Sequence, residues 1–163
     1  MNPGRLLPTL LIDGHTLTQS MSILEYLEEA YSSVPLLPKG AFERAEVRSI
    51  CNMIACDTQP VSNQRVLVYV GEKKAEWAKH WITVNFEGLE TVLARTAGRF
   101  CYGDSVTLAD VCLVPQVYNA YRWGVDMASF PTIDRLYKEL NEMPAFVAAN
   151  AHTQPDTPAD MRQ

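Results

Sequence analysis

The sequence predicts a mainly α-helical fold that is preceded by one short β-hairpin and its helix. Apolar residues recur at three- and four-residue spacing through most of residues 42–148, which is the period of helices with one buried face. Residues 103–116 have the composition of a capped helix start. Near the beginning, Asp13-Gly14 separates two short apolar runs, as in a tight hairpin turn.

The composition excludes several classes of function. With 163 residues, the chain can form one or two small domains with a real core. It is 47% hydrophobic and 20% charged, which is typical of a globular protein. Its net charge of −5, without a basic stripe, argues against a nucleic-acid partner. No apolar run is long enough to span a membrane, and no signal peptide opens the chain, so we expect a cytoplasmic protein.

The cysteines and histidines do not predict a metal site. No cysteine pair has Cys-x-x-Cys spacing, and no histidine lies near a cysteine at a spacing typical of metal ligands. The cysteines lie in apolar, helix-like contexts, so we expect buried free thiols in a reducing compartment, with disulfides as the alternative. The residues concerned are Cys51, Cys56, Cys101, Cys112, His15, His80 and His152.

The first 40 residues predict strand, turn, strand, helix and linker. Residues 8–12 and 15–17 are expected to form the two strands of a hairpin, with glycine supplying positive φ at the turn. Apolar residues between 21 and 30 then follow helical spacing. Prolines and a glycine mark residues 34–40 as a linker.

Two long helices are expected after the linker. The first extends from about Phe42 towards Tyr69, and Pro60 should kink or divide it. The second extends from about Lys73 to Arg95. Its expected buried face comprises Trp77, Trp81, Val84, Leu89 and Val92.

The helix that follows has a capping box and an apolar surface. Thr107 has a hydroxyl that can accept a hydrogen bond from a first-turn amide, and the Asp110 carboxylate can reach back to the Thr107 amide. The helix, residues 108–121, should be buried because its apolar surface is wide. We expect one of its faces to comprise Leu108, Val111, Cys112 and Pro115.

Prolines mark the later elements. Pro115 should kink the capped helix, because a proline inside a helix removes one hydrogen bond. Pro131 and Pro144 each suit a first helical position, which predicts two shorter helices. Residues 154–163 are expected to be irregular.

Two spots near the beginning of the chain could bind a ligand. If the Leu7-Pro8 bond is cis, the Leu7 backbone can pair with an extended peptide, although trans is the commoner form. Gln19-Ser20 opens a helix, whose free amides and partial positive charge attract a carboxylate. The alternative is that Ser20 only caps the helix.

Motifs along essentially the whole chain resemble a known family. The first set is similar to the second half of the thioredoxin-like domain of glutathione transferases: Asn2-Pro3, Leu7-Pro8-Thr9-Leu10, Ile12-Asp13-Gly14, Gln19-Ser20 and residues 23–29. The second set resembles the all-helical C-terminal domain of the zeta class, the maleylacetoacetate isomerases: Gln59-Pro60, Asn63, Gly103-Asp104, residues 107–110 and 113–116, Asn119-Ala120 and residues 154–158.

The resemblance implies a site for glutathione and for a diacid substrate. Arg122 would bind a substrate carboxylate; the alternative is a solvated charge at a helix end. The class pattern reads Asn-Leu-Ser where this chain has Asn63-Gln64-Arg65. The implied glutathione-binding residues are Leu7, Pro8, Gln19, Ser20, Gln59, Asn63, Gln64 and Arg65.

The resemblance also implies a reaction and an organisation. The reaction is the glutathione-dependent isomerisation of maleylacetoacetate to fumarylacetoacetate in tyrosine and phenylalanine breakdown, carried out by a homodimer. Residues 1–33 would be part of the glutathione-binding domain, and residues 39–163 the helical domain. The family's sulfur-activating Ser-Ser-Cys segment does not occur in these residues, so we expect weak activity or none from this chain alone. The rival hypothesis is a non-catalytic binding or dimerisation module.

Overall fold

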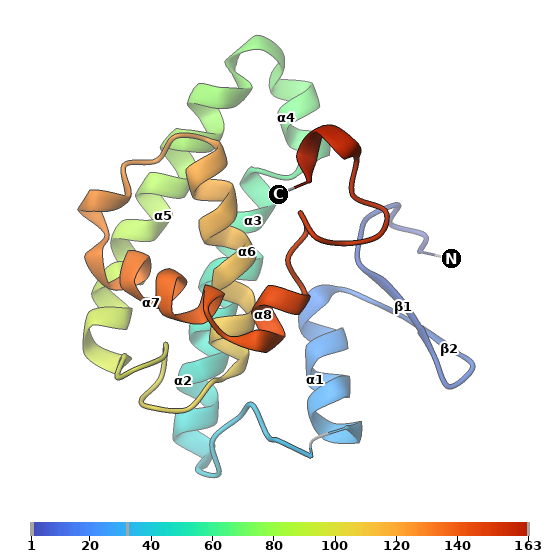
Figure 1. The fold of residues 1–163 in the computed structure, drawn as a ribbon, viewed down its shortest axis with the longest axis vertical. Coiled ribbons are helices and arrows are strands. Elements are labelled where there is room, and N and C mark those ends of the chain that lie inside the picture. The colour runs from blue at the N-terminus through green and yellow to red at the C-terminus, as the bar shows by residue number, and fades with distance from the viewer. Residues whose placement is uncertain (1, 32, 163) are drawn as a thin grey trace.

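Helices form most of the structure, as the sequence predicts. The computed structural model describes residues 2–31 and 33–162 (Figure 1). Its order is β1 (Thr9–Ile12), β2 (His15–Thr18), α1 (Ser20–Ala30), α2 (Ala41–Asn52), η1 (Met53–Thr58), α3 (Gln59–Val61), α4 (Gln64–Val70), η2 (Gly71–Lys73), α5 (Lys74–Thr96), α6 (Leu108–Arg122), η3 (Met127–Ser129), α7 (Pro131–Asn141), α8 (Pro144–Ala148) and η4 (Ala159–Met161).

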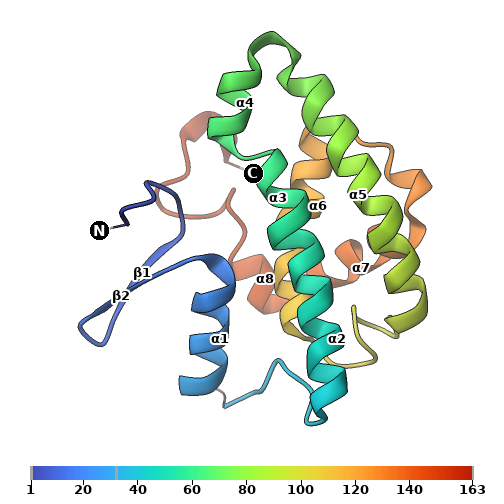
Figure 2. The same cartoon turned by 180° about the vertical axis from the view of Figure 1, so that it is seen from behind.

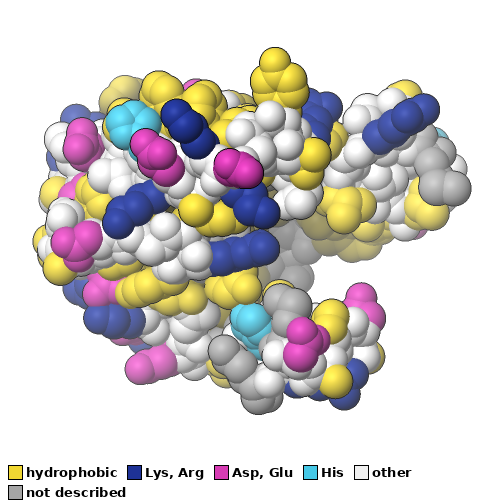
Figure 3. Space-filling view, turned by 90° about the horizontal axis from the view of Figure 1, so that it is seen from above, with side chains coloured by type: hydrophobic (Ala, Val, Ile, Leu, Met, Phe, Trp, Pro, Cys, Tyr) yellow, Lys and Arg dark blue, Asp and Glu magenta, His cyan; other side chains and the backbone are white. Residues whose placement is uncertain are grey.

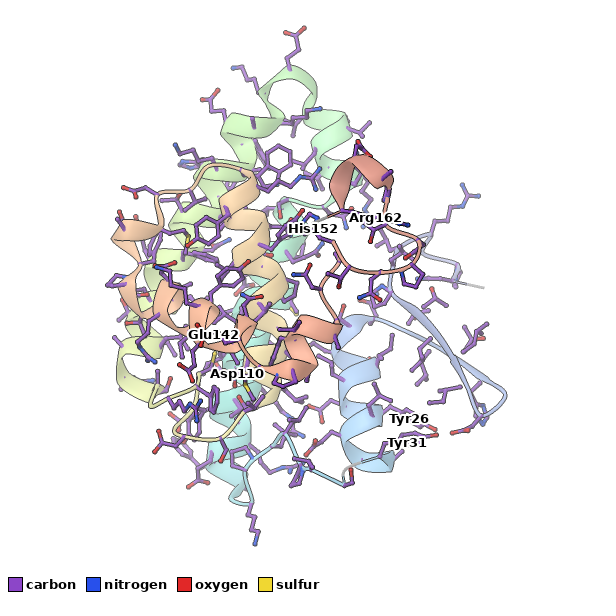
Figure 4. All side chains as sticks on the ribbon, viewed as in Figure 1. Tyr26, Tyr31, Asp110, Glu142, His152 and Arg162 are labelled. Atoms are coloured by element: carbon purple, nitrogen blue, oxygen red, sulfur yellow. The ribbon has the colours of Figure 1, made fainter. Side chains whose placement is uncertain are left out.

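The hairpin confirms the predicted turn. β1 and β2 pair antiparallel, and Asp13 and Gly14 both have positive φ, 50° and 77°. The turn is fastened to α1, because the hydroxyls of Tyr26 and Tyr31 donate to Asp13 Oδ2 at 3.1 and 2.6 Å (Figure 4). These hydrogen bonds lower the pKa of Asp13, and the one from Tyr31 raises the tyrosine pKa to about 12.

Two carboxylates fix α1 against the helices. Figure 2 shows α1 beside α2, with the hairpin on the outer side of α1. Glu25 accepts hydrogen bonds from Arg48 of α2 at 2.6 and 2.8 Å. The buried Glu28 carboxylate accepts from the amides of Leu36 and Leu37 at 2.8 and 3.1 Å, which holds the linker. The N-terminal segment is therefore positioned by the bundle.

The first long helix is divided near Pro60. α2 continues into the π-helical segment η1, where the Gln59 amide donates to the carbonyl of Ile54, five residues back. Pro60 has no amide hydrogen to donate, and the helix ends two residues later at Ser62. Asn63 then caps α4, accepting from the Arg65 amide at 3.1 Å.

The predicted buried face of α5 is partly wrong. Trp77 and Val84 are 36% and 40% exposed. Trp77 can lie near the surface because its indole donates a hydrogen bond to the carbonyl of Val61 at 2.9 Å. Phe86 lies at the centre of the core, in edge contact with Phe130, with ring centroids 5.6 Å apart. The buried residues of α5 are Ala78, Ile82, Phe86, Leu89 and Leu93.

The capping box of α6 is present, and Asp110 makes its main hydrogen bonds. Its carboxylate accepts from the amide and the hydroxyl of Thr107 at 2.7 and 2.9 Å, and from the Cys101 amide at 2.8 Å. The Thr107 hydroxyl thus donates to this carboxylate, a role that the sequence does not predict. Thr107 and Asp110 are both buried, as is most of α6.

One apolar face of α6 is buried in the bundle, and another borders a cavity. Residues such as Leu113 and Val117 are fully buried against the bundle. On the face that the sequence predicts to be buried, Val111 and Cys112 are only half-buried, and Pro115 is exposed. This face borders a cavity beside α1. In the described part of the chain, no helix is both long and apolar enough to cross a membrane.

The last elements follow the proline signals. α7 and α8 begin at Pro131 and Pro144, as predicted. Glu90 of α5 caps α7 from a distance, since its carboxylate accepts from the amides of Thr132 and Ile133 at 2.8 and 3.0 Å. Residues 154–162 are irregular, as expected, apart from the short 3₁₀ turn η4.

Candidate functional site

Two adjoining cavities lie between the N-terminal segment and the helices. The outer one has a volume of about 430 Å³ and the inner one about 290 Å³. They share four residues, Pro8, Ser20, Ala55 and Gln59. Seen from above, the molecular surface has a deep hollow that opens at one side, and the acidic and basic side chains on this face are interspersed (Figure 3).

The outer cavity gathers seven of the eight residues predicted to bind glutathione. They come from three separate stretches: the segment before β1, the start of α1, and the region from α3 to α4. Arg65 is the only charged residue that lines this cavity among the described residues. The seven are Leu7, Pro8, Gln19, Ser20, Gln59, Asn63 and Arg65.

Leu7 lines the outer cavity. The Leu7-Pro8 peptide bond is cis, so the commoner trans form is excluded here. Leu7 is 91% exposed. Within residues 2–31 and 33–162, neither its amide nor its carbonyl has a hydrogen-bond partner. Both groups can therefore pair with an extended peptide.

The N-terminus of α1 opens into the same cavity. The N-cap is Gln19, with φ 73° and ψ 121°, and its side chain makes no capping hydrogen bond. The alternative that Ser20 caps the helix is therefore wrong, because Ser20 is already the first helical residue. The first turn contains no acidic side chain, so its free amides and partial positive charge remain available to an anion.

The inner cavity is apolar with a few uncharged polar groups. Ile23 and Leu24 of α1, Ile54 of η1, and Val111 and Pro115 of α6 form most of its wall. No charged residue lines it among the described residues. Its polar lining residues are Ser20, Gln59, Cys112, Gln116 and Asn119. Sequence reasoning assigned no role to Gln116 or Asn119, although both lie within the motifs that resemble the zeta class.

The buried cysteines do not supply a reactive sulfur. All four cysteines are free thiols, as expected, but only Cys51 and Cys101 are buried; Cys112 is half-buried and Cys56 is exposed. A hydrogen bond with Cys112, together with burial, raises the pKa of the Cys51 thiol. Burial, followed by the nearby Asp110 carboxylate, raises the pKa of Cys101. Cys51 and Cys101 therefore remain protonated at neutral pH and serve as packing residues.

Arg122 and Gln64 lie in a different depression from the other predicted site residues. This depression also contains Leu67 and Trp123. The exposed Arg122 guanidinium lies over the Trp123 ring, 5.3 Å from its centroid. On α6, Arg122 is three residues beyond Asn119, which lines the inner cavity. The assigned roles of Arg122 and Gln64 stay predictions.

Comparison with known proteins places this geometry in a family. The model of the glutathione S-transferase C-terminal domain matches residues 64–149. A probable maleylacetoacetate isomerase of Drosophila melanogaster is 48% identical over 99% of this chain and 71% of its own length. The chain belongs to the zeta-class glutathione transferases, the family of the maleylacetoacetate isomerases.

Solved structures of this family have the same fold. The maleylacetoacetate isomerase of Anaeromyxobacter dehalogenans, with glutathione bound in its active site, is 42% identical and has a TM-score of 0.90, over 96% of this chain and 76% of that one. A second structure of that protein holds dicarboxyethyl glutathione and citrate. A bacterial zeta-class maleylpyruvate isomerase is 37% identical, with a TM-score of 0.92 over 96% and 78% of the two chains.

The zeta-class relatives are longer than this chain. The chain spans 71% and 65% of the two Drosophila melanogaster isomerases that it matches.

Proposed function

We propose that this chain forms the glutathione cleft and the substrate wall of a maleylacetoacetate isomerase. The observation that carries the proposal is that Leu7, whose backbone groups are unpaired among the described residues, shares one cavity with the N-terminus of α1. The isomerase of Anaeromyxobacter dehalogenans, which binds glutathione, supports it. The proposed reaction is the isomerisation of maleylacetoacetate to fumarylacetoacetate in tyrosine and phenylalanine catabolism.

The chemistry of the outer cavity suits glutathione. The Leu7 amide and carbonyl would pair with the cysteinyl part of this extended peptide. The free amides at Ser20, with the Gln19 side chain beside them, would hold the carboxylate of the γ-glutamyl end. Gln59, Asn63 and Arg65 would close the opposite side, where Arg65 supplies the positive charge for a second carboxylate.

The inner cavity suits the reacting part of the substrate. Glutathione supplies a thiol that adds reversibly to the conjugated double bond, so that the bond can rotate. The residues of this chain surround that bond with apolar side chains and limit the access of water. We propose that Arg122 binds a substrate carboxylate at the far end, with Gln64 in the same depression. A Ser-Ser-Cys segment that would activate the sulfur does not occur in the 163 residues.

The proposal includes the organisation of the protein. Residues 1–33 belong to the glutathione-binding domain, and residues 39–163 form the helical domain. The protein acts in the cytoplasm as a homodimer, the commonest closed symmetry.

Titration with glutathione tests the proposal. We expect this chain to bind glutathione in the millimolar range, about 4 kcal/mol of affinity, with amide NMR shifts at Leu7 and Ser20. Ser20→Glu should abolish binding, because it places a negative charge where the ligand carboxylate lies. Ser22→Glu is the matched control, since Ser22 is exposed in the same turn but lines neither cavity. The proposal fails if the shifts occur elsewhere, or if the two variants bind equally well.

A further inference from the structure

One polar side chain of the inner cavity, that of Gln116, has no hydrogen-bond partner among the described residues. Gln116 is only 2% exposed. Among the residues that the structure describes, neither its Nε2 nor its Oε1 has a partner, although both atoms are fully buried. It lies in the middle of α6, directly after Pro115, and lines the inner cavity.

This arrangement is unusual for a side chain that serves only the fold. Most buried polar groups in proteins are hydrogen-bonded, because an unmade hydrogen bond is costly in an apolar environment. The rest of the buried polar structure in this region follows the rule: Asp110, six residues earlier on the same helix, accepts three hydrogen bonds. An apolar residue at position 116 would fit the fold better, and a ligand in the cavity that Gln116 lines can supply the missing partner.

The surroundings define the chemistry of that partner. The walls near Gln116 are aliphatic, and no lysine, arginine or histidine lines the inner cavity among the described residues. A ligand carboxylate there would be a buried charge without a cation, which is unfavourable. The anion-binding features lie in the outer cavity instead, at the N-terminus of α1 and at Arg65. An uncharged carbonyl oxygen is the acceptor that an isolated amide N–H group can satisfy here.

We propose that Gln116 is a specificity-determining residue whose Nε2 donates a hydrogen bond to the ketone oxygen of the bound substrate. The inference rests on the proposed function, because it assumes that the reacting ketone lies in the inner cavity beside the glutathione sulfur. The inference goes beyond the proposed function by giving the two kinds of substrate group different binding residues. Gln116 binds the conjugated ketone, and other residues bind the carboxylates.

Two glutathione conjugates of equal chain length test the inference by calorimetry. S-(3-oxobutyl)glutathione carries a ketone that S-butylglutathione lacks. This protein should bind the ketone conjugate about 3–10-fold more tightly, the value of one added hydrogen bond. Gln116→Met, which preserves length and removes the amide, should abolish that preference. A third conjugate, S-(2-carboxyethyl)glutathione, should bind the wild type and Gln116→Met with equal affinity, since binding of its carboxylate does not involve Gln116.

The melting temperature distinguishes a ligand-binding role of Gln116 from a structural one. If Gln116 served the fold, replacing it would lower the melting temperature. Gln116→Met should raise the melting temperature by about 2–4 °C, because it removes an unpaired buried amide. Asn119→Leu is the matched control: this carboxamide lines the same cavity but is only half-buried. It should keep the ketone preference and gain no stability.

The outcomes separate the inference from the proposed function. If neither conjugate binds, the proposed function fails, and this inference fails with it. If both bind without a ketone preference, or if Gln116→Met keeps the preference, the inference alone is refuted. A lower melting temperature for Gln116→Met, or loss of the preference in Asn119→Leu, would also overturn it.

Discussion

Replacing Asp110 with alanine should destabilise this protein by about 2–6 kcal/mol. The Asp110 carboxylate is fully buried and accepts from two backbone amides, those of Thr107 and Cys101, and from the Thr107 hydroxyl. Alanine leaves these donors in the core without their acceptor. Each buried amide without a partner costs about 1–3 kcal/mol, so the two amides alone give the predicted range.

Thermal and urea unfolding, followed by circular dichroism, measure this effect. For a chain of this size, one kcal/mol shifts the melting temperature by about 2–4 °C, so the expected decrease is about 5–20 °C. Asp126→Ala is the matched control, because Asp126 is exposed and accepts from one backbone amide, that of Ala128. Loss of such an exposed cap costs about 0.5–1 kcal/mol.

The isosteric variant Asp110→Asn separates shape from charge. Asparagine keeps the volume and one oxygen acceptor, but its NH₂ group faces donors. We expect its melting temperature to fall between those of the wild type and Asp110→Ala. The reasoning would be refuted if Asp110→Ala lost no more stability than Asp126→Ala, since the buried hydrogen bonds would then add nothing to an ordinary cap.

Three further predictions concern the linker, pH and catalysis. Glu28→Gln should speed hydrogen exchange at Leu36 and Leu37 about tenfold, as it weakens their hydrogen bonds; unchanged exchange contradicts this. The hydrogen bond from Arg48 lowers the pKa of Glu25, so this pair stabilises the fold above the unfolded pKa and loses its effect as pH falls through the folded one. Glu25→Gln should therefore cost up to about 1 kcal/mol at neutral pH in unfolding measurements, a difference that fades below about pH 4.3; a difference that grows in acid contradicts the sign. Finally, this chain alone should isomerise maleylacetone with glutathione near the solution rate, and equal turnover by a fusion with a zeta-class N-terminal half would contradict the need for sulfur-activating donors.

Local chemistry in the sequence was enough to predict most element boundaries. The turn at Asp13-Gly14 needs two residues with positive φ, and Pro131 and Pro144 need first helical positions. These requirements involve only neighbours in the chain, so the residue types determine them. The division near Pro60 belongs to the same class, because a missing amide hydrogen acts locally.

Contacts between distant segments could not be predicted in this way. Glu90 caps α7 from more than 40 residues away, and nothing near either segment in the sequence indicates this contact. The face of α5 was assigned from apolar spacing, but Trp77 can lie at the surface because its indole finds the carbonyl of Val61. Amphipathic residues satisfy both environments, so the period alone does not decide which face is buried.

The residues of the candidate site were likewise predictable only in part. The resemblance to the family predicted the residues of the outer cavity, and the structure brings seven of them together. It did not predict Gln116, because a single glutamine in an apolar helix is informative only once its missing partners are known. Gln64 and Arg122 lie in another depression, so the outer cavity does not account for the binding roles predicted for them.

The capping box and the inner cavity are structurally linked, because α6 contributes residues to both. Asp110 fixes the start of α6 to the loop at Cys101 through buried hydrogen bonds, which sets the rotation of the helix about its axis. Cys112, Gln116 and Asn119 then follow at intervals of four and three residues, so they share the face that lines the cavity. A change in helix rotation would turn this face away from α1. We therefore expect Asp110 to influence ligand binding without contacting the ligand, and Asp110→Asn should weaken the ketone preference to the extent that it loosens the helix start.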